Sequence, residues 1–350
     1  MKPMITPLKT GVAYHSNRIL KSVQEDMIDC VNHNMNLVVH MYTHNDMDRH
    51  KYVMKDIISI TEDLGLECWV DNWGLGGPPG EKSHFLAYHP EAHQYFSNGD
   101  MDPVHACYNA PSFVAFSKTW VDHVAEAGGK TLFWDEPHLL GKSINGKMEY
   151  TCRCETCQKV FEERYNRPMP RDFDADCMEF RTWSIIHYFR TVTDYAASLG
   201  LKNTTCVMLN PIFGISLDNL DQLGTLPHLD SLGSDPYWIG ANPENVYQFV
   251  YEKTRTNLEM ADTYQKDHNL WIQGYNIPAG REDEIIYATD AAYDAGARTI
   301  INWSFRGGES NNYRCDKPEV AWRVIGESMA RIRNRHNDEV RRLSMELRSK

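Results

Sequence analysis

Two adjacent carboxylates end an apolar stretch near the middle of the chain. Residues 131–140 read TLFWDEPHLL, so apolar and aromatic side chains lead directly into Asp135 and Glu136. When two carboxyl groups lie this close and neighbouring aromatic rings limit their solvation, one of them keeps its proton while the other is charged. A protonated carboxyl beside a charged one is the arrangement that general acid catalysis uses. The stretch therefore predicts a buried strand that ends in an acid–base pair.

A second cluster of reactive residues follows about twenty positions later. TCRCETCQKVFEERY begins at Thr151 and spaces Cys152, Cys154 and Cys157 as C-x-C-x-x-C, close enough for three thiolates to reach one ion. A structural zinc ion takes four such ligands in a tetrahedron, and Cys107 in the upstream segment HACYNAP is the best candidate for the fourth. Two alternatives stay open: reduced thiols without a metal, and a redox role without zinc.

Eight short apolar segments recur along the chain with helical patterns between them, as in Leu20, Val23, Met27 and Val31. The segments are too uniformly apolar for half-exposed strands and suit a parallel sheet that is buried on both faces. This alternation predicts an α/β fold, a (β/α)8 TIM barrel, as one domain over residues 1–350, with long loops after the third and fourth strands. The predicted strands are 11–16, 37–42, 67–71, 131–136, 204–209, 229–235, 270–275 and 299–304.

In a barrel of this kind, catalytic residues lie at the carboxyl ends of the strands. Aromatic rings pack on the apolar faces of sugars, whereas carboxylates and amides bind sugar hydroxyls. The carboxylates, amides and aromatic residues at the predicted strand ends therefore predict a small carbohydrate substrate, although each of these residues alone is as readily structural. Glu136 would be the general acid, Asp235 its partner and Asp71 the reserve, while Arg306 would meet an anionic substituent or pair with a carboxylate of the barrel. The predicted substrate-binding residues are Tyr14, His40, Asp71, Trp73, Tyr237, Gln273, Trp303 and Arg306.

The segment from Cys107 to Asn166, which includes CRCETCQKVFEERYN, resembles the zinc-binding stretch of family 42 β-galactosidases. Those enzymes are (β/α)8 barrels of glycoside hydrolase clan A, and outside this segment the similarity is only architectural. The resemblance implies a structural zinc ion, held within about 107–166 by Cys107, Cys152, Cys154 and Cys157. It also aligns Glu136 with the clan's acid/base glutamate, although the family has asparagine where this chain has Asp135.

The chain departs from the clan on the seventh strand. Clan A enzymes place a nucleophilic glutamate there, whereas LWIQGYN has Gln273 at or near that position. A neutral amide cannot form a glycosyl ester, so the usual retaining double displacement is not expected. The chain is also shorter than those galactosidases.

These observations predict a glycoside hydrolase-like enzyme that cleaves a small glycoside or oligosaccharide by carboxylate acid/base catalysis. One alternative is a substrate-assisted N-acetylhexosaminidase, in which Asp135 orients the acetamide of the sugar and Glu136 is the acid. Another is a sugar-binding barrel without catalysis.

Composition excludes several other classes. A formal net charge of -12 argues against a nucleic-acid partner, and acidic residues interrupt the basic run from Arg331 to Arg342, which indicates a solvated helix. No segment has the apolar length of a signal peptide or a membrane span, and nine cysteines, several within apolar stretches, suit a cytoplasmic protein. No glycine-rich phosphate loop is recognisable, so no organic cofactor is expected. Homo-oligomerisation is left open.

Overall fold

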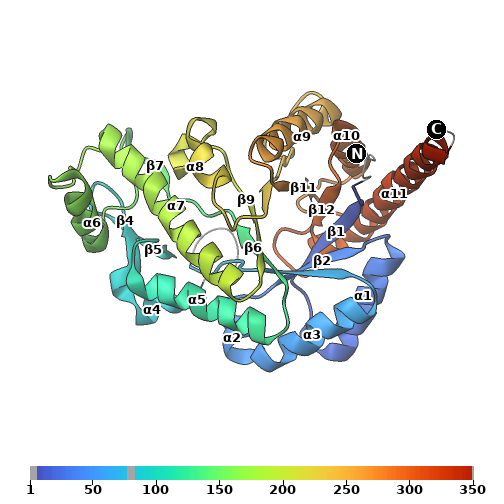
Figure 1. Ribbon diagram of the computed structural model, residues 1–350, viewed down its shortest axis with the longest axis horizontal. Coiled ribbons are helices and arrows are strands. Elements are labelled where there is room, and N and C mark those ends of the chain that lie inside the picture. Colours follow the sequence, from blue (N-terminus) through green and yellow to red (C-terminus); the bar gives the residue numbers. More distant parts are fainter. Residues whose placement is uncertain (1–5, 77–82, 349–350) are drawn as a thin grey trace. The chain divides into compact units, whose positions relative to one another are not determined.

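Eight parallel strands form a closed barrel in the order β1-β12-β11-β10-β9-β6-β3-β2 (Figure 1). The computed structural model describes residues 6–76 and 83–348. Each of the eight predicted segments overlaps one of these strands, so the α/β barrel prediction is confirmed. The strands are β1 (Lys9–Tyr14), β2 (Leu37–Met41), β3 (Glu67–Asp71), β6 (Thr131–Asp135), β9 (Lys202–Cys206), β10 (Ser231–Ser234), β11 (Asp267–Gln273) and β12 (Thr299–Trp303).

Parallel pairing and burial explain why these segments are strands. β1 pairs in parallel with both β2 and β12, and β12 pairs in turn with β11. All five residues of β2 are buried, as are the last five of β1 and of β11. A strand that is covered on both faces needs apolar side chains in both directions, which is the pattern in the sequence.

The chain divides into two compact units. Unit 1 holds the described residues of Met1–Met41, Val53–Trp69 and Ser231–Lys350, and unit 2 holds those of Tyr42–Tyr52 and Val70–Asp230. The organisation as one domain stays a prediction. Helices of unit 1, including α3, which starts in unit 2, are α1 (Leu20–Asn32), α3 (Lys51–Asp63), α9 (Val246–Thr263), α10 (Glu284–Ala295), α11 (Pro318–Arg348) and the 3-10 turn η4 (Phe305–Gly308).

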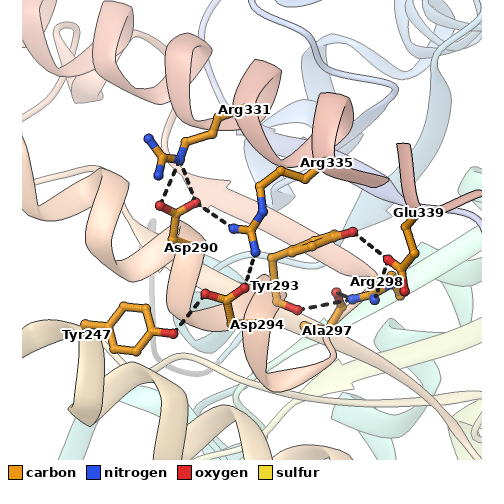
Figure 2. A network of polar contacts seen from close by, with 9 residues as sticks. All are labelled: Tyr247, Asp290, Tyr293, Asp294, Ala297, Arg298, Arg331, Arg335 and Glu339. Carbon is orange, nitrogen blue, oxygen red and sulfur yellow. Dashed lines mark hydrogen bonds and ion pairs between the residues drawn. The ribbon is translucent and has the colours of Figure 1, made fainter. Parts of the chain in front are cut away.

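Helix α11 is fixed to α10 by ion pairs, which Figure 2 shows. Arg335 reaches both Asp290, at 3.2 Å, and Asp294, while Arg331 lies 2.9 Å from Asp290. The hydroxyl of Tyr247 in α9 donates to Asp294 at 2.8 Å and so links α9 to the same network. The basic run in the sequence therefore belongs to a helix whose arginines pair with neighbouring carboxylates, as its interleaved charges indicate.

The two long connections of unit 2 carry structure of their own. β4 (His93–Tyr95) pairs with β5 (Met101–Ala106) in the connection after β3, of which residues 77–82 lie outside the described residues. β7 (Gly141–Ile144) pairs with β8 (Lys147–Tyr150) in the connection after β6. The helices are α2 (His44–Arg49), α4 (Phe85–Tyr88), α5 (Pro111–Glu126), α6 (Glu155–Tyr165), α7 (Ala175–Ser198) and α8 (Asp221–Gly224), with 3-10 turns η1 (Pro90–Ala92), η2 (Pro211–Phe213) and η3 (Leu217–Asn219).

Glycines end several helices where the sequence predicts it. Gly65, Gly200 and Gly296 follow α3, α7 and α10 with φ of 78°, 80° and 113°, a region that costs a residue with a Cβ atom but not glycine. Within the described part of the chain, no helix has the length and apolar content needed to span a bilayer.

Candidate active site and cysteine cluster

The four predicted cysteine ligands converge in unit 2. All four are buried, and their sulfur atoms lie within 4.8 Å of one another. Cys107 Sγ is 3.4 Å from Cys157 Sγ and 3.6 Å from Cys154 Sγ. Zinc–sulfur bonds of about 2.3 Å in a tetrahedron place the sulfurs about 3.8 Å apart. The cluster therefore has the donors and the size that one tetrahedral metal ion requires.

Two hairpins and a helix bring these sulfurs together. Cys107 directly follows β5, Cys152 lies just after β8, and Cys154 is the N-cap of α6, where its sulfur accepts a hydrogen bond from the Cys157 N–H at 3.4 Å. Asn109 donates to the Cys157 sulfur at 3.3 Å. Hydrogen bonds from Cys107, and then from the other two thiols, hold the pKa of Cys154 well below its usual value, whereas hydrogen bonds within the cluster and burial raise the pKa of Cys107 and of Cys157. The helix N-terminus at Cys154 favours its thiolate, the form that binds a metal.

The end of β6 carries Asp135 and Glu136, and Asn72 fixes its position. The backbone N–H of Asn72 donates to the carbonyl of Phe133 at 3.2 Å, and its side-chain oxygen accepts from the N–H of Asp135 at 3.0 Å. Both carboxylates are half-buried. Glu136 has φ of 34°, a left-handed conformation that costs energy in a residue with a Cβ atom. The backbone thus turns sharply at the residue that the sequence assigns as the acid.

A small cavity adjoins Asp135 within unit 2. Its volume of about 20 Å³ suits roughly one water molecule, since one water needs about 10–15 Å³ on this scale. A sugar ring is far larger than this space. Around it lie Asn72, Leu75, Tyr108, Trp134, Asp135 and Tyr188.

Asp71 at the end of β3 is completely buried. Burial raises the pKa of its carboxyl well above the ordinary value, and a backbone hydrogen bond at Trp73 offsets only part of that rise. The assignment of Asp71 as the reserve for the second catalytic carboxylate stays a prediction. Trp73 follows it on the same connection, half-buried.

Tyr14 and His40 in unit 1 are bonded to helices. The hydroxyl of Tyr14 donates to Asp26 of α1 at 2.7 Å, and Nε2 of His40 lies 2.9 Å from the hydroxyl of Thr61 in α3. Neither side chain is exposed, and burial lowers the pKa of His40 to about 3. These contacts give both residues partners on helices, and their place in a sugar site stays a prediction.

Arg306, after β12, is surrounded by carboxylates of unit 1. Its guanidinium lies 2.9 Å from Asp29, 3.6 Å from Asp26 and 3.4 Å from Glu309. Of the two roles that the sequence leaves open, pairing with a carboxylate of the protein is the one observed.

Gln273 ends β11 and has its side chain committed to the backbone. Its side-chain oxygen accepts from the N–H groups of Trp238 at 3.0 Å and Ile239 at 3.1 Å, and its NH2 group donates to the carbonyl of Tyr275 at 3.2 Å. The residue is only 2% exposed. An amide supplies an acceptor and a donor together, whereas a carboxylate supplies only acceptors. The side chain therefore fixes the loop after β10, so Gln273 acts as a positioning residue.

Aromatic rings gather at the same end of unit 1. Tyr275 packs edge-on against Tyr237, with ring centroids 5.2 Å apart, and against Tyr313 at 6.4 Å. Trp303 at the end of β12 lies 5.8 Å from the ring of His15, which Asn311 contacts at 3.2 Å. Tyr237 and Trp303 thus lie beside aromatic and polar residues that the sequence does not predict as part of a site.

Of these neighbours, Tyr313 and Asn311 come from the irregular segment before α11, where hydrophobic periodicity carries no signal. Burial lowers the pKa of His15 to about 4, so its ring is neutral at pH 7. Asp235 follows β10 in the same unit, and its carbonyl accepts from the N–H of Tyr237 at 2.6 Å. Glu136 belongs to unit 2, so the pairing of Asp235 with Glu136 stays a prediction.

Comparison with known proteins shows the fold. No protein-family model and no curated protein sequence matches the chain. A β-galactosidase from the psychrophilic Marinomonas ef1 superposes with a TM-score of 0.70 at 11% identity, over 93% of this chain and 60% of that one. A β-galactosidase from the Antarctic haloarchaeon Halorubrum lacusprofundi gives 0.69 at 12% identity, over 93% and 58%. The catalytic domain of β-amylase from Paenibacillus polymyxa gives 0.65 at 10% identity, over 92% and 98%.

The chain thus spans less than two thirds of each of the two β-galactosidases and nearly all of the β-amylase domain. At these identities the likeness establishes the barrel that these glycosidases share. The resemblance to family 42 in particular stays a prediction.

If Gln273 is a positioning residue, Gln273→Glu will destabilise the protein and will not create a nucleophile. The new oxygen would face the carbonyl of Tyr275 without a proton to donate, so the free energy of unfolding should fall by about 1–3 kcal/mol. Urea denaturation measures this, with the exposed Gln24→Glu in α1 as the control that should change little. Unchanged stability together with a gain of retaining glycosidase activity would identify position 273 as a vacated nucleophile site instead.

Proposed function

We propose that the chain is a glycoside hydrolase-like enzyme that acts on a small glycoside or oligosaccharide. The observation that carries this proposal is Glu136, a glutamate held in a left-handed conformation directly after the fourth barrel strand. Two facts support the proposal. The carboxyl ends of barrel strands are the usual place of catalysis, and the fold is shared with glycosidases. The aromatic group of Tyr237, Tyr275 and Tyr313 offers apolar faces of the kind on which sugars pack.

In this mechanism Glu136 protonates the leaving oxygen of the glycoside. Asp235 activates a water molecule from the opposite face of the sugar, because Gln273 offers no carboxylate. Asp135 stays beside Glu136 on the backbone that Asn72 fixes, where its charge favours the protonated form of the acid. Two carboxylates that flank the bond, with a water between one of them and the sugar, produce inversion at the anomeric carbon.

Two other functions remain as outcomes of the experiments. Adjacent Asp135 and Glu136 also suit a substrate-assisted N-acetylhexosaminidase, in which the aspartate orients the acetamide that attacks. A panel of aryl N-acetylglucosaminides beside unmodified glycosides separates that activity from the proposed one. Ligand binding without turnover across the panel would point to a sugar-binding barrel.

We further propose that zinc occupies the cysteine cluster as a structural ion, without an organic cofactor. Four buried sulfurs suit zinc among the common metals. The sulfur of Cys107 lies 3.4 Å from that of Cys157 and 3.6 Å from that of Cys154, and the Asn109 amide donates to Cys157. A bound ion would tie the ends of β5 and β8 to α6. All nine cysteines are free and buried, which favours a reducing, cytoplasmic location.

Replacing the acid should abolish most of the activity. Glu136→Gln preserves the shape of the side chain but removes the transferable proton, so turnover of an unactivated glycoside should fall by at least about 100-fold. The loss should be smaller for aryl glycosides whose leaving group needs no proton. Glu163→Gln, on the exposed side of α6, is the matched control and should leave turnover unchanged. Activity near that of the wild type in Glu136→Gln would remove this residue from the mechanism.

The stereochemistry of the product tests the absence of a nucleophile. We expect the first-formed sugar to have the anomeric configuration opposite to that of the substrate. Proton NMR of the reaction, recorded before mutarotation, reads this directly. A product with the configuration of the substrate would exclude inversion and favour the acetamide route or a nucleophile elsewhere in the chain.

The zinc proposal predicts about one zinc ion per chain by elemental analysis. Because metal-binding energy at such sites is largely folding energy, Cys154→Ser should lower both the zinc content and the melting temperature. Cys206→Ser removes another buried thiol outside the cluster and should retain the zinc. Protein that is free of zinc and as stable as the zinc-containing preparation would contradict the proposal.

A further inference from the structure

A second group of metal-ligating side chains lies in unit 2, apart from the cysteine cluster. His44 and Asp48 are four residues apart on α2 and therefore share one face of the helix. His84 precedes α4, in the connection after β3. One ligand atom from each of the three residues lies within 4.8 Å of the others. Two imidazoles and a carboxylate are a donor set that zinc, nickel and copper accept.

The spacing within this group differs from that of a plain hydrogen-bonded triad. Nε2 of His84 lies 2.9 Å from one carboxylate oxygen of Asp48, but Nε2 of His44 lies 4.0 Å from the other. A separation of 4.0 Å is too long for a hydrogen bond. An ion with bonds of about 2.0–2.2 Å to nitrogen and oxygen bridges ligand atoms that are about 3–4 Å apart. The 4.0 Å between Nε2 of His44 and the Asp48 oxygen therefore matches two ligand atoms that one ion bridges.

Ser83 orients the first imidazole. Nδ1 of His44 lies 2.8 Å from the Ser83 hydroxyl, which also accepts from the N–H of Phe85 at 3.1 Å. When Nδ1 donates to Ser83, Nε2 is left with a free lone pair on the side of Asp48. Histidines that ligate a metal commonly have the other ring nitrogen held by such a partner.

The surroundings leave this group both supported and accessible. The ring of Phe116 in α5 packs edge-on against His44 at 4.5 Å, and the His44 side chain is only 12% exposed. Burial, with His84 nearby, lowers the pKa of His44. The side chains of His84 and Asp48 are 43% and 52% exposed. The rings of His44 and His84 stack at 3.7 Å with an interplanar angle of 12°, so the exposed ring of His84 has to turn before both lone pairs point at one ion.

We propose that His44, Asp48 and His84 bind one divalent transition-metal ion, with water in its remaining positions. The ion would join α2 to the segment before α4, two parts of unit 2 that lie 40 positions apart in the sequence. The proposal is independent of the glycosidase proposal, because it makes no use of turnover. It is also independent of zinc at the cysteines, because its donors are nitrogen and oxygen.

Calorimetric titration of the full chain with Ni²⁺ tests the proposal, after dialysis to remove loosely held metal. We expect one saturable equivalent in the wild type and in Cys154→Ser, because the site contains no thiolate. His84→Gln and Asp48→Asn should each weaken nickel binding by at least about 10-fold. Both positions are exposed, and equal melting temperatures without nickel would show that the variants fold. Paramagnetic broadening of two histidine ring signals in wild-type NMR spectra should accompany the first equivalent.

His89→Gln is the matched control. His89 is also 43% exposed and also pairs with a carboxylate, Glu91 at 3.2 Å, but it belongs to no three-ligand group among the described residues. Its loss should leave nickel binding unchanged. Wild-type protein without a saturable equivalent, or equal affinity in His84→Gln, Asp48→Asn and the wild type, would overturn the proposal. Equal weakening of nickel binding by His84→Gln, Asp48→Asn and the control His89→Gln would indicate adventitious surface binding and would overturn the proposal as well.

Discussion

Burial of the barrel strands on both faces decides where polar chemistry can lie in this chain. A polar side chain inside such a strand is costly unless it finds partners within the protein, because an unsatisfied buried group costs about 1–3 kcal/mol. Asn203 in β9 illustrates the requirement: it accepts from the indole of Trp134 at 2.9 Å and donates to the carbonyls of Thr193 and His228. Groups that are to meet a substrate are therefore confined to the strand ends, where Glu136 and Asp235 are found.

At those ends, side-chain amides take over the positioning that strand pairing provides elsewhere. Asn72 uses its backbone N–H and its side-chain oxygen to hold the last residues of β6. Gln273 uses both ends of its amide to hold the segments after β10 and β11. The same property that makes Gln273 suitable as a positioning residue, a donor and an acceptor on one planar group, makes it useless as a nucleophile.

Strand positions could be predicted from the sequence because apolar runs of this length, with helical patterns between them, have few other solutions. Residues 67–71 were predicted with the bounds that β3 has, and the other seven segments each overlap their strand. The directions of Tyr14 and His40 could not be predicted in this way. Successive side chains point to opposite faces of a strand, and when both faces are apolar the sequence does not distinguish the barrel interior from the helix layer. Asp26 and Thr61, which decide the matter, lie on helices, and only the folded chain shows them as partners.

The two candidate metal groups differ in the same respect, and the difference predicts different behaviour. Three of the four cysteines lie within six consecutive positions, so their spacing alone indicates an ion, whereas His84 joins His44 and Asp48 only through the fold. The cysteines are buried and tie hairpins to a helix, so their ion would be bound as the chain folds and lost only with unfolding. The histidine group lies on elements that other contacts already hold, including the packing of Phe116 on His44, and two of its three ligands are exposed. An ion there would exchange with solvent while the protein stays folded, because the cost of leaving those side chains without a metal is low.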